Sequence, residues 1–411
     1  MPNFTMSNTL FPLKILVAIG GSIALNASAA EWSVVPTVSA STTYSDNIRL
    51  LSQSTQQLPL QSNTIFSISP AVEFGHETEV RKVSGKLRAA VNRYSNDNEL
   101  NANDAFFDLS WREKGERSEF SLLSNNTFDS TLATLLQEFG DPTERRQRQK
   151  ISVNPNYAYN LNSRTTLGLG YRYEDVSFKD AGNTALVDFR SNELLPFAQF
   201  KLDGCSELQI NAELWQLITV PADLAISRST FKSGLLSALY VRTVDETNVW
   251  SAGAGYYAIN QDTTGNTNNP LQRSESYNGV TALVKYLRKN EYNNTTITAA
   301  REVNPSGENT LLLTNRLVVD FAQGLTPYLN SGVTLGLYKN SAVGAENKKT
   351  SQYFRLSPSL SWKPAREWRL DGGIQFQRVK TTVASGQDTK ADAKSAFLNL
   401  IYYWDKTAIS R

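Results

Sequence analysis

The chain has 411 residues, and its 41 lysines and arginines nearly balance its 39 aspartates and glutamates, leaving a formal charge of +2. That balance excludes a strongly basic nucleic-acid-binding domain and an acidic tail. Hydrophobic residues make up 40% of the chain, which is low for a compact enzyme of this length, while aromatic residues reach 10%, which excludes a disordered chain.

The first 30 residues have the features of a secretory signal peptide. Lys14 precedes an apolar run over 15–25, and small residues up to Ala29 and Ala30 provide a cleavage site. The run is too short to cross ~30 Å of hydrocarbon, which requires about 20 apolar residues. We therefore expect an exported protein that is cleaved near Ala29 or Ala30. Cys205 is the only cysteine, so no internal disulfide can form.

Apolar and polar residues then alternate along one segment after another, which is the period of β-strands. In the first segment Trp32, Val38 and Tyr44 share a face, and serine and threonine occupy the opposite face. The alternation recurs to the end of the chain and indicates about 18 strands, within a range of 16 to 18, each of roughly ten residues. No later apolar run is long enough for a membrane-spanning helix.

Short and long connections alternate between these segments. This asymmetry, with an even strand number and both termini on the short side, is typical of bacterial outer-membrane barrels. A soluble sandwich or propeller is the alternative, but no fixed 40–50 residue repeat marks propeller blades. We expect eight short turns, near 75–80, 112–117, 160–164, 203–206, 243–247, 289–293, 323–326 and 363–367. We expect nine long loops, near 45–61, 95–103, 127–148, 178–190, 219–229, 260–275, 303–310, 339–351 and 380–392.

These patterns together predict an all-β fold, a closed antiparallel transmembrane β-barrel over 31–404 with both termini in the periplasm. A signal peptide over 1–30 precedes it and a C-terminal tail over 405–411 follows it. The expected location is the bacterial outer membrane, where the apolar strand faces meet lipid and lipopolysaccharide.

The polar strand faces are then expected to line a water-filled lumen. The predicted inward positions hold more cations than anions, so the lumen would conduct and weakly favour anions. An ordinary solvated lumen with cross-strand ion pairs is the simpler alternative. The candidates are the cations Lys82, Lys86, Arg88, Arg172, Lys201, Lys285, Arg316, Arg355 and Arg369, and the anions Glu73, Asp108, Glu174, Glu213, Asp320 and Asp371.

One expected external loop has helical spacing. An amphipathic helix there either folds into the lumen and narrows the pore or packs on the rim. The basic residues that follow it either meet lipopolysaccharide phosphates or form a solvated charge run. The constriction candidates are Leu132, Leu135, Leu136 and Phe139, and the basic residues are Arg145, Arg146, Arg148 and Lys150.

Catalysis finds little support in the sequence. His76 is the only histidine, and it falls in the first expected short turn on the periplasmic side. Barrel hydrolases resemble one another in working near the external leaflet instead. No Cys/His cluster offers a metal site. We therefore expect neither enzyme activity nor a metal or cofactor.

The segment Tyr44-Ser45-Asp46-Asn47-Ile48-Arg49-Leu50 resembles the Tyr-x-Asp-Asn signature near the mature N-terminus of β-barrel porins encoded with exopolysaccharide and exosortase (PEP-CTERM) gene clusters. The stretches 154–167 and 171–175 are similar too, and the resemblance covers nearly all of the mature chain. It implies an outer-membrane channel for surface polysaccharide, working with periplasmic export machinery, and it supplies no catalytic residues. Barrels of this kind usually end on an aromatic residue, whereas here Trp404 is followed by 405–411.

Two functional hypotheses follow from the barrel pattern. The first is a channel that exports an exopolysaccharide, as the resemblance implies. The second is a general or solute-selective diffusion porin with a weak anion preference, as the predicted lumen charges suggest.

Overall fold

The computed structural model describes residues 32–50, 62–131, 146–179, 186–221, 228–264, 272–306, 309–343, 349–382 and 388–409. Among these residues, no helix has the length and apolar character needed to span a membrane. The elements are β1 (Trp32–Ser45), β2 (Asn63–Glu77), β3 (Arg81–Tyr94), η1 (Asn98–Leu100), β4 (Ala102–Lys114), β5 (Ser118–Ser130), β6 (Gln147–Asn160), β7 (Thr165–Phe178), β8 (Asp188–Lys201), β9 (Ser206–Val220), β10 (Arg228–Thr243), β11 (Asn248–Thr264), β12 (Arg273–Lys289), β13 (Asn293–Pro305), β14 (Leu311–Gly324), β15 (Leu329–Ala342), β16 (Thr350–Trp362), β17 (Trp368–Thr382), β18 (Asp388–Tyr403) and β19 (Thr407–Ile409).

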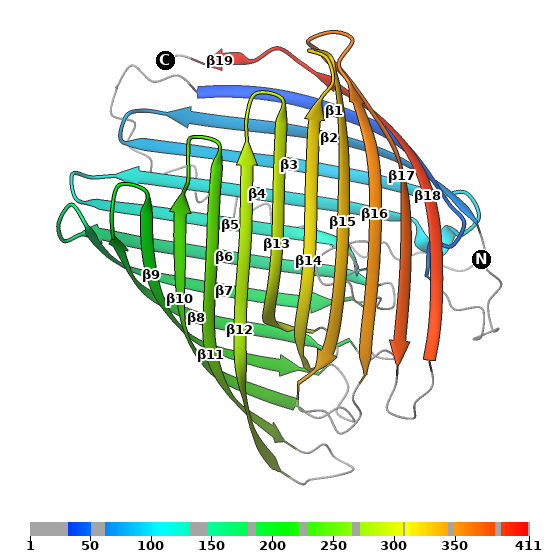
Figure 1. Cartoon of the computed structure of the whole chain (residues 1–411). Coiled ribbons are helices and arrows are strands. Elements are labelled where there is room, and N and C mark those ends of the chain that lie inside the picture. Colours follow the sequence, from blue (N-terminus) through cyan, green and yellow to red (C-terminus); the bar gives the residue numbers. More distant parts are fainter. Residues whose placement is uncertain are drawn as a thin grey trace, which may run out of the picture.

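The strands close into a single barrel (Figure 1). Strands β1 to β18 pair with their chain neighbours in antiparallel fashion, and β1 also pairs with β18, which closes the sheet on itself. The predicted closed antiparallel barrel of about 18 strands is confirmed. Closure matters physically because a sheet in lipid must satisfy every backbone N–H and C=O within itself.

The two faces of the barrel wall differ in polarity as the alternation requires. Large apolar side chains such as Ile68, Leu236 and Leu400 are exposed on the outer face, where no other part of the described chain covers them. Their sequence neighbours point to the opposite face, which we call the lumen face. Because an apolar outer band and a polar interior define a transmembrane barrel, the fold is of that type.

Paired aromatic rings lie on the outer face close to the short turns, an end of the barrel that we call the short-turn rim. The ring of Trp368 lies 4.8 Å from that of Tyr402, and Trp250 lies 4.5 Å from Tyr286. His76 belongs to the same belt, because its ring lies 4.9 Å from that of Trp32. Such a belt is typical of the edge of a membrane, where aromatic rings contact both lipid and water.

The strands are longer than predicted. They contain 13 to 17 residues, apart from the short β19, instead of roughly ten. The extra residues lie mainly at the rim that carries the long loops, which we call the long-loop rim. Outward side chains are polar there, such as Lys232 on β10 and Lys380 on β17, so the apolar alternation stops before the strand does. The predicted loops are consequently too long at their edges.

Four prolines within strands each interrupt the pairing on one side. Pairing skips two positions at Pro70, Pro155, Pro196 and Pro358 and then resumes in the same register. Proline has no N–H to donate, so one ladder contact is lost at each site. The register survives because intact pairs flank each gap.

The barrel is sealed with an irregularity opposite Pro36. Thr37 pairs with Tyr403 and Val34 pairs with Thr407, so the closing strand has one residue more than β1 between these pairs. This is a β-bulge. The carbonyl of Pro36 accepts a hydrogen bond of 3.2 Å from the residue after Tyr403. Beyond the bulge, β19 continues the pairing along β1, within the part of the chain that the sequence sets apart as a tail.

Candidate channel lumen

The register places every charged residue predicted to line the lumen on the lumen face. Opposite residues in antiparallel strands point the same way, so Glu73, Lys86 and Asp108 share this face while Leu87 points outward. The same relation holds for Lys82, Arg88, Arg172, Glu174, Lys201, Glu213, Lys285, Arg316, Asp320, Arg355, Arg369 and Asp371.

A row of polar contacts crosses β2 to β5 on this face. Lys86 Nζ lies 2.6 Å from Glu73 Oε1 and is also directly opposite Asp108. Asn125 Nδ2 donates to Asp108 Oδ1 at 2.6 Å. Cross-strand contacts of this kind contribute about 0.2–1 kcal/mol each, and less where water screens them. The row therefore fixes side-chain positions on the wall more than it stabilises the barrel.

Arg172 is the centre of a second cluster, on β6 to β9. Its Nη1 lies 2.7 Å from Glu193 Oε2, and its Nε donates to Asn154 Oδ1 at 3.2 Å. Glu213 is on the lumen face of the neighbouring β9, two residues from Trp215, which is directly opposite Glu193. Glu193 is only 8% exposed, so this cluster belongs to the wall and leaves Arg172 partly neutralised.

Most of the other predicted cations also have a partner. Lys82 pairs with Glu77 at 3.0 Å, Arg316 with Glu302 at 2.9 Å, and Arg369 with Asp371 at 2.7 Å. Arg88 lies 3.9 Å above the ring of Phe106. Among the predicted cations, Arg88, Lys201, Lys285 and Arg355 have no ion pair with another described residue.

The expected cationic excess is therefore smaller than the sequence suggested. Sequence reasoning did not assign Glu77, Glu193 and Glu302 to the lumen, because alternation is weak near strand ends and in the segment around β13. In the structure each of them neutralises a predicted cation. A count of charges along the predicted faces could not reveal this, since partners are set by register.

An apolar cluster lies within the barrel near the long-loop rim. Its buried members include Leu217, Phe231 and Ile259 from the lumen faces of β9 to β11. Val303 and Leu313, near the tip of the β13–β14 hairpin, pack against it. In the rest of β13 and β14, the side chains on the same strand faces as Val303 and Leu313 point outward. The hairpin tip has therefore turned inward across the lumen.

The strand pairing shows how the hairpin tip becomes free to turn. Pairing between β12 and β13 ends at Ala282 and Arg301, whereas β12 stays paired with β11 as far as Arg273. Figure 1 accordingly shows β11 and β12 running on past the end of β13. The tip of the hairpin is held by pairing between β13 and β14, by pairing of β14 with β15 as far as Leu312, and by the apolar cluster.

A second apolar cluster lies on the lumen face of β15 to β17. Leu50, which follows β1, packs against Tyr338, Tyr353 and Val379 on the lumen faces of β15 to β17. Its φ of 49° lies in the left-handed region, which a non-glycine residue adopts only when its surroundings fix it. The N–H of Leu50 donates to the carbonyl of Asn47 at 3.2 Å, and the Nε of the preceding Arg49 donates to Asp97 at 2.9 Å.

The predicted constriction residues Leu132, Leu135, Leu136 and Phe139, and Arg145 beside them, lie outside the described residues. Two of the basic residues near them do not face lipid, which corrects one expectation. Arg148 is 3% exposed and forms a buried pair with Asp129, and Lys150 lies 3.2 Å from Glu174. Both side chains are on the lumen face, so neither can meet a lipid phosphate.

The described residues contain no group of three or more His, Cys, Asp or Glu side chains that could hold a metal ion. The lumen face carries paired charges and hydroxyl groups. Two apolar clusters narrow the lumen at the long-loop rim. This arrangement suits passage of a hydrated solute.

No family model and no curated protein matches the sequence. Among solved structures, the ferric citrate transporter FecA in its unliganded form is 10% identical, with a TM-score of 0.48 over 92% of this chain and 79% of that one. OccAB4 of Acinetobacter baumannii is 11% identical, with a TM-score of 0.44 over 92% and 99%. The outer membrane channel DcaP of Acinetobacter baumannii is 12% identical, with a TM-score of 0.42 over 92% and 99%. Likeness at this level does not assign a function.

Proposed function

We propose that this protein is an outer-membrane channel through which a surface exopolysaccharide leaves the cell. The single observation that carries the channel is a closed barrel with an apolar outer face and a polar, ion-paired lumen face. Barrels of 16 to 18 strands are wide enough to hold an aqueous passage.

The chemistry of the lumen wall supports a polyhydroxylated cargo. The lumen face of β1 carries Thr37, Ser39, Ser41 and Thr43 in succession, without a charge. Hydroxyl groups exchange hydrogen bonds with sugar hydroxyls as readily as with water, so a chain of sugars can slide past without a strong binding step. The resemblance of Tyr44–Leu50 to exopolysaccharide-associated porins points the same way.

Deletion of the gene tests this proposal. Surface polysaccharide should disappear while the polymer accumulates inside the cell, and a plasmid-borne wild-type copy should restore secretion. Normal secretion in the deletion strain, with no related barrel taking over, would contradict polysaccharide export but leave the channel itself intact.

The second candidate is a diffusion porin for small solutes. It is favoured by Arg88, Lys201, Lys285 and Arg355, whose charges on the lumen face are not neutralised by other described residues. Planar-bilayer recording separates the two candidates. A steady open conductance that becomes less anion-selective in Lys201→Gln/Lys285→Gln would favour the porin, whereas a closed wild-type channel would count against it.

A further inference from the structure

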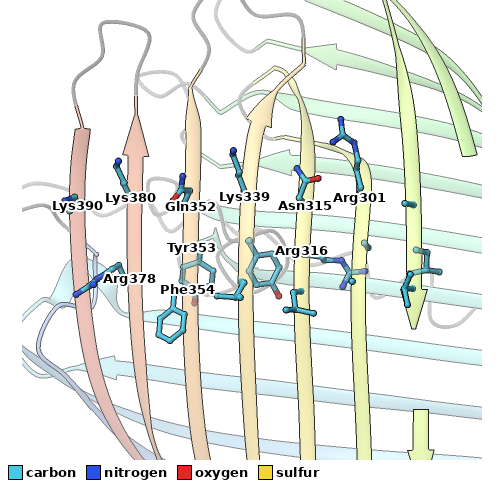
Figure 2. A pocket seen from close by; sticks show the side chains of 18 of the residues that line it. Arg301, Asn315, Arg316, Lys339, Gln352, Tyr353, Phe354, Arg378, Lys380 and Lys390 are labelled. Carbon is cyan, nitrogen blue, oxygen red and sulfur yellow. The ribbon is translucent and has the colours of Figure 1, made fainter. Parts of the chain in front are cut away.

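Six polar residues form a continuous row across the outer face of β13 to β18, and four of them are cations. Each is directly opposite the next in the strand register, so their side chains stand side by side at one height (Figure 2). We call them the outer cation row: Arg301, Asn315, Lys339, Gln352, Lys380 and Lys390.

The outer face changes character immediately below this row. Two residues along each of the central strands, the outward positions are Leu317, Leu337 and Phe354, which are again opposite one another. These side chains and the row above them line one shallow hollow on the outer wall. On β17 and β18 the same height carries the ion pair of Arg378 and Asp392, which also lines the hollow. Apolar side chains and the row therefore meet along a boundary on β14 to β16.

The height of the row matches the edge of a membrane. On β16, Gln352 in the row is ten residues from Trp362, whose side chain belongs to the outer face at the short-turn rim. A strand segment of ten residues, tilted by about 40°, rises about 25 Å, which is the usual height of the lipid-facing apolar band. On β16 the row therefore lies where the hydrocarbon ends at the long-loop rim, which faces the outside of the cell in bacterial barrels. On β17 and β18 outward charges begin lower, at Arg378, Asp392 and Lys394.

The charges in the row lack enough anions to balance them. Lys380 and Lys390 are directly opposite, and like charges in that position repel. Asp388 lies 2.8 Å from Lys380, but Lys339, Lys390 and Arg301 form no ion pair with any described residue. The outer surface thus holds repelling cations whose repulsion an external anion would relieve.

The wall behind the row is rigid. Alternate residues on the same strands, including Tyr338, Tyr353 and Val379, are buried on the lumen face in the cluster that contains Leu50. The row is consequently presented on a packed platform, so that a ligand does not have to order the strands when it binds.

We propose that this surface binds the phosphorylated head group of an outer-leaflet glycolipid, lipopolysaccharide. Its phosphates contact Lys339, Lys380, Lys390 and Arg301, and its acyl chains lie against the apolar positions below them. A phosphate ion alone would make no contact with the apolar half of the hollow. An uncharged lipid would not reduce the repulsion between the cations. The inference depends on the membrane position of the barrel and not on the transported substrate.

The decisive comparison removes three charges from the row without shortening the side chains much. The full chain, extracted folded from outer membranes and freed of lipid, is titrated with lipopolysaccharide at low salt. Lys339→Gln/Lys380→Gln/Lys390→Gln should bind on the order of 100-fold more weakly than the wild type, given the contribution of each basic residue near a charged lipid surface. Heat-modified gel migration of the variant verifies that it is folded.

Matched controls make the result specific. Lys114→Gln/Lys201→Gln/Lys285→Gln removes equal charge from the lumen face and should bind like the wild type, as should Lys339→Arg/Lys380→Arg/Lys390→Arg. Dephosphorylated glycolipid and phosphatidylglycerol vesicles should bind the wild type clearly more weakly. Equal binding by the row variant and the wild type, or equal binding of phosphatidylglycerol and lipopolysaccharide, would overturn the proposal.

Discussion

Asp46 and Lys394 are joined by two hydrogen bonds although 348 residues separate them in the sequence. The N–H of Asp46 donates to the carbonyl of Lys394 at 3.1 Å, and the N–H of Lys394 donates to Asp46 Oδ1 at 2.7 Å. Asn47 Nδ2 adds a bond of 2.9 Å to the carbonyl of Asp392. Asp46 and Asn47, from the segment Tyr44–Leu50, thus connect the end of β1 to β18 at the long-loop rim through hydrogen bonds.

Loss of this fastening should destabilise the barrel modestly. Asp46→Ala removes the acceptor for the Lys394 N–H, and we expect unfolding free energy to fall by about 1 kcal/mol. Asp46→Asn keeps an oxygen in the same place and should retain most of the stability. The measurement is denaturant unfolding of the detergent-folded barrel, and equal midpoints for both variants would contradict the role of the acceptor.

Gly168 is required by an aromatic ring on the neighbouring strand. It is directly opposite Phe197, whose ring occupies the space that a Cβ at position 168 would need. Gly168→Ala should therefore cost about 1–3 kcal/mol through overpacking. Gly204→Ala is the matched control, because nothing lies within 4 Å of a Cβ there.

A double variant checks the cause of that loss. Gly168→Ala combined with Phe197→Leu should recover part of the stability lost by Gly168→Ala alone, since the two changes act on one contact. Strictly additive losses would show that the ring is not responsible.

The inward tip of the β13–β14 hairpin should limit conductance. Val303→Ser/Leu313→Ser removes its apolar contacts with Phe231 and its neighbours, so the tip should leave the lumen more often. We expect a larger or noisier single-channel conductance in planar bilayers. Leu360→Ser on the outer face is the control and should leave conductance unchanged; equal currents from wild type and hairpin variant would refute the constriction.

The short turn between β10 and β11 should weaken in acid. Asp245 accepts hydrogen bonds from the Thr247 N–H at 2.7 Å, the Thr247 hydroxyl at 2.8 Å and the Asn248 N–H at 2.9 Å. These bonds, the Thr247 side-chain bond foremost, lower the pKa of Asp245 from 3.8 to about 2. Because the folded state has the lower pKa, the stabilisation is complete above about pH 4 and is lost as the pH falls towards 2.

A pairwise comparison isolates that one group. The difference in unfolding free energy between the wild type and Asp245→Asn should shrink between pH 5 and pH 2, while contributions from other carboxyls cancel. A difference that stays constant over this range would mean that the charge of Asp245 does not support the turn.

Much of this architecture could be predicted from the sequence, because lipid imposes a strict alternation. The eight turns of the short-turn rim fall within or beside the predicted stretches, such as 203–205 in the expected 203–206. Alternation also separates Leu87 from Lys86. To assign a side chain to the inner or outer face, only the order of residues along one strand is needed, and the sequence contains that order.

The surfaces that depend on register were beyond sequence reasoning. Lys339, Lys380 and Lys390 fall in predicted long loops, so nothing in the sequence indicates that they share one face and one height. The inward turn of Val303 and Leu313 is equally hidden, because Val303 falls in a predicted loop and the three leucines over 311–313 show no alternation. Only the early end of pairing between β12 and β13 reveals it.

The seam between β1 and the two closing strands constrains how the molecule can be made. On one side, β1 pairs with β18 and β19, which are synthesised after all the other described strands. Until these strands pair, the sheet has two edges with unpaired backbone groups, and each edge can pair with another chain. The incomplete sheet must therefore be protected during assembly. In a protein truncated before Thr407, part of β1 would have unpaired backbone groups.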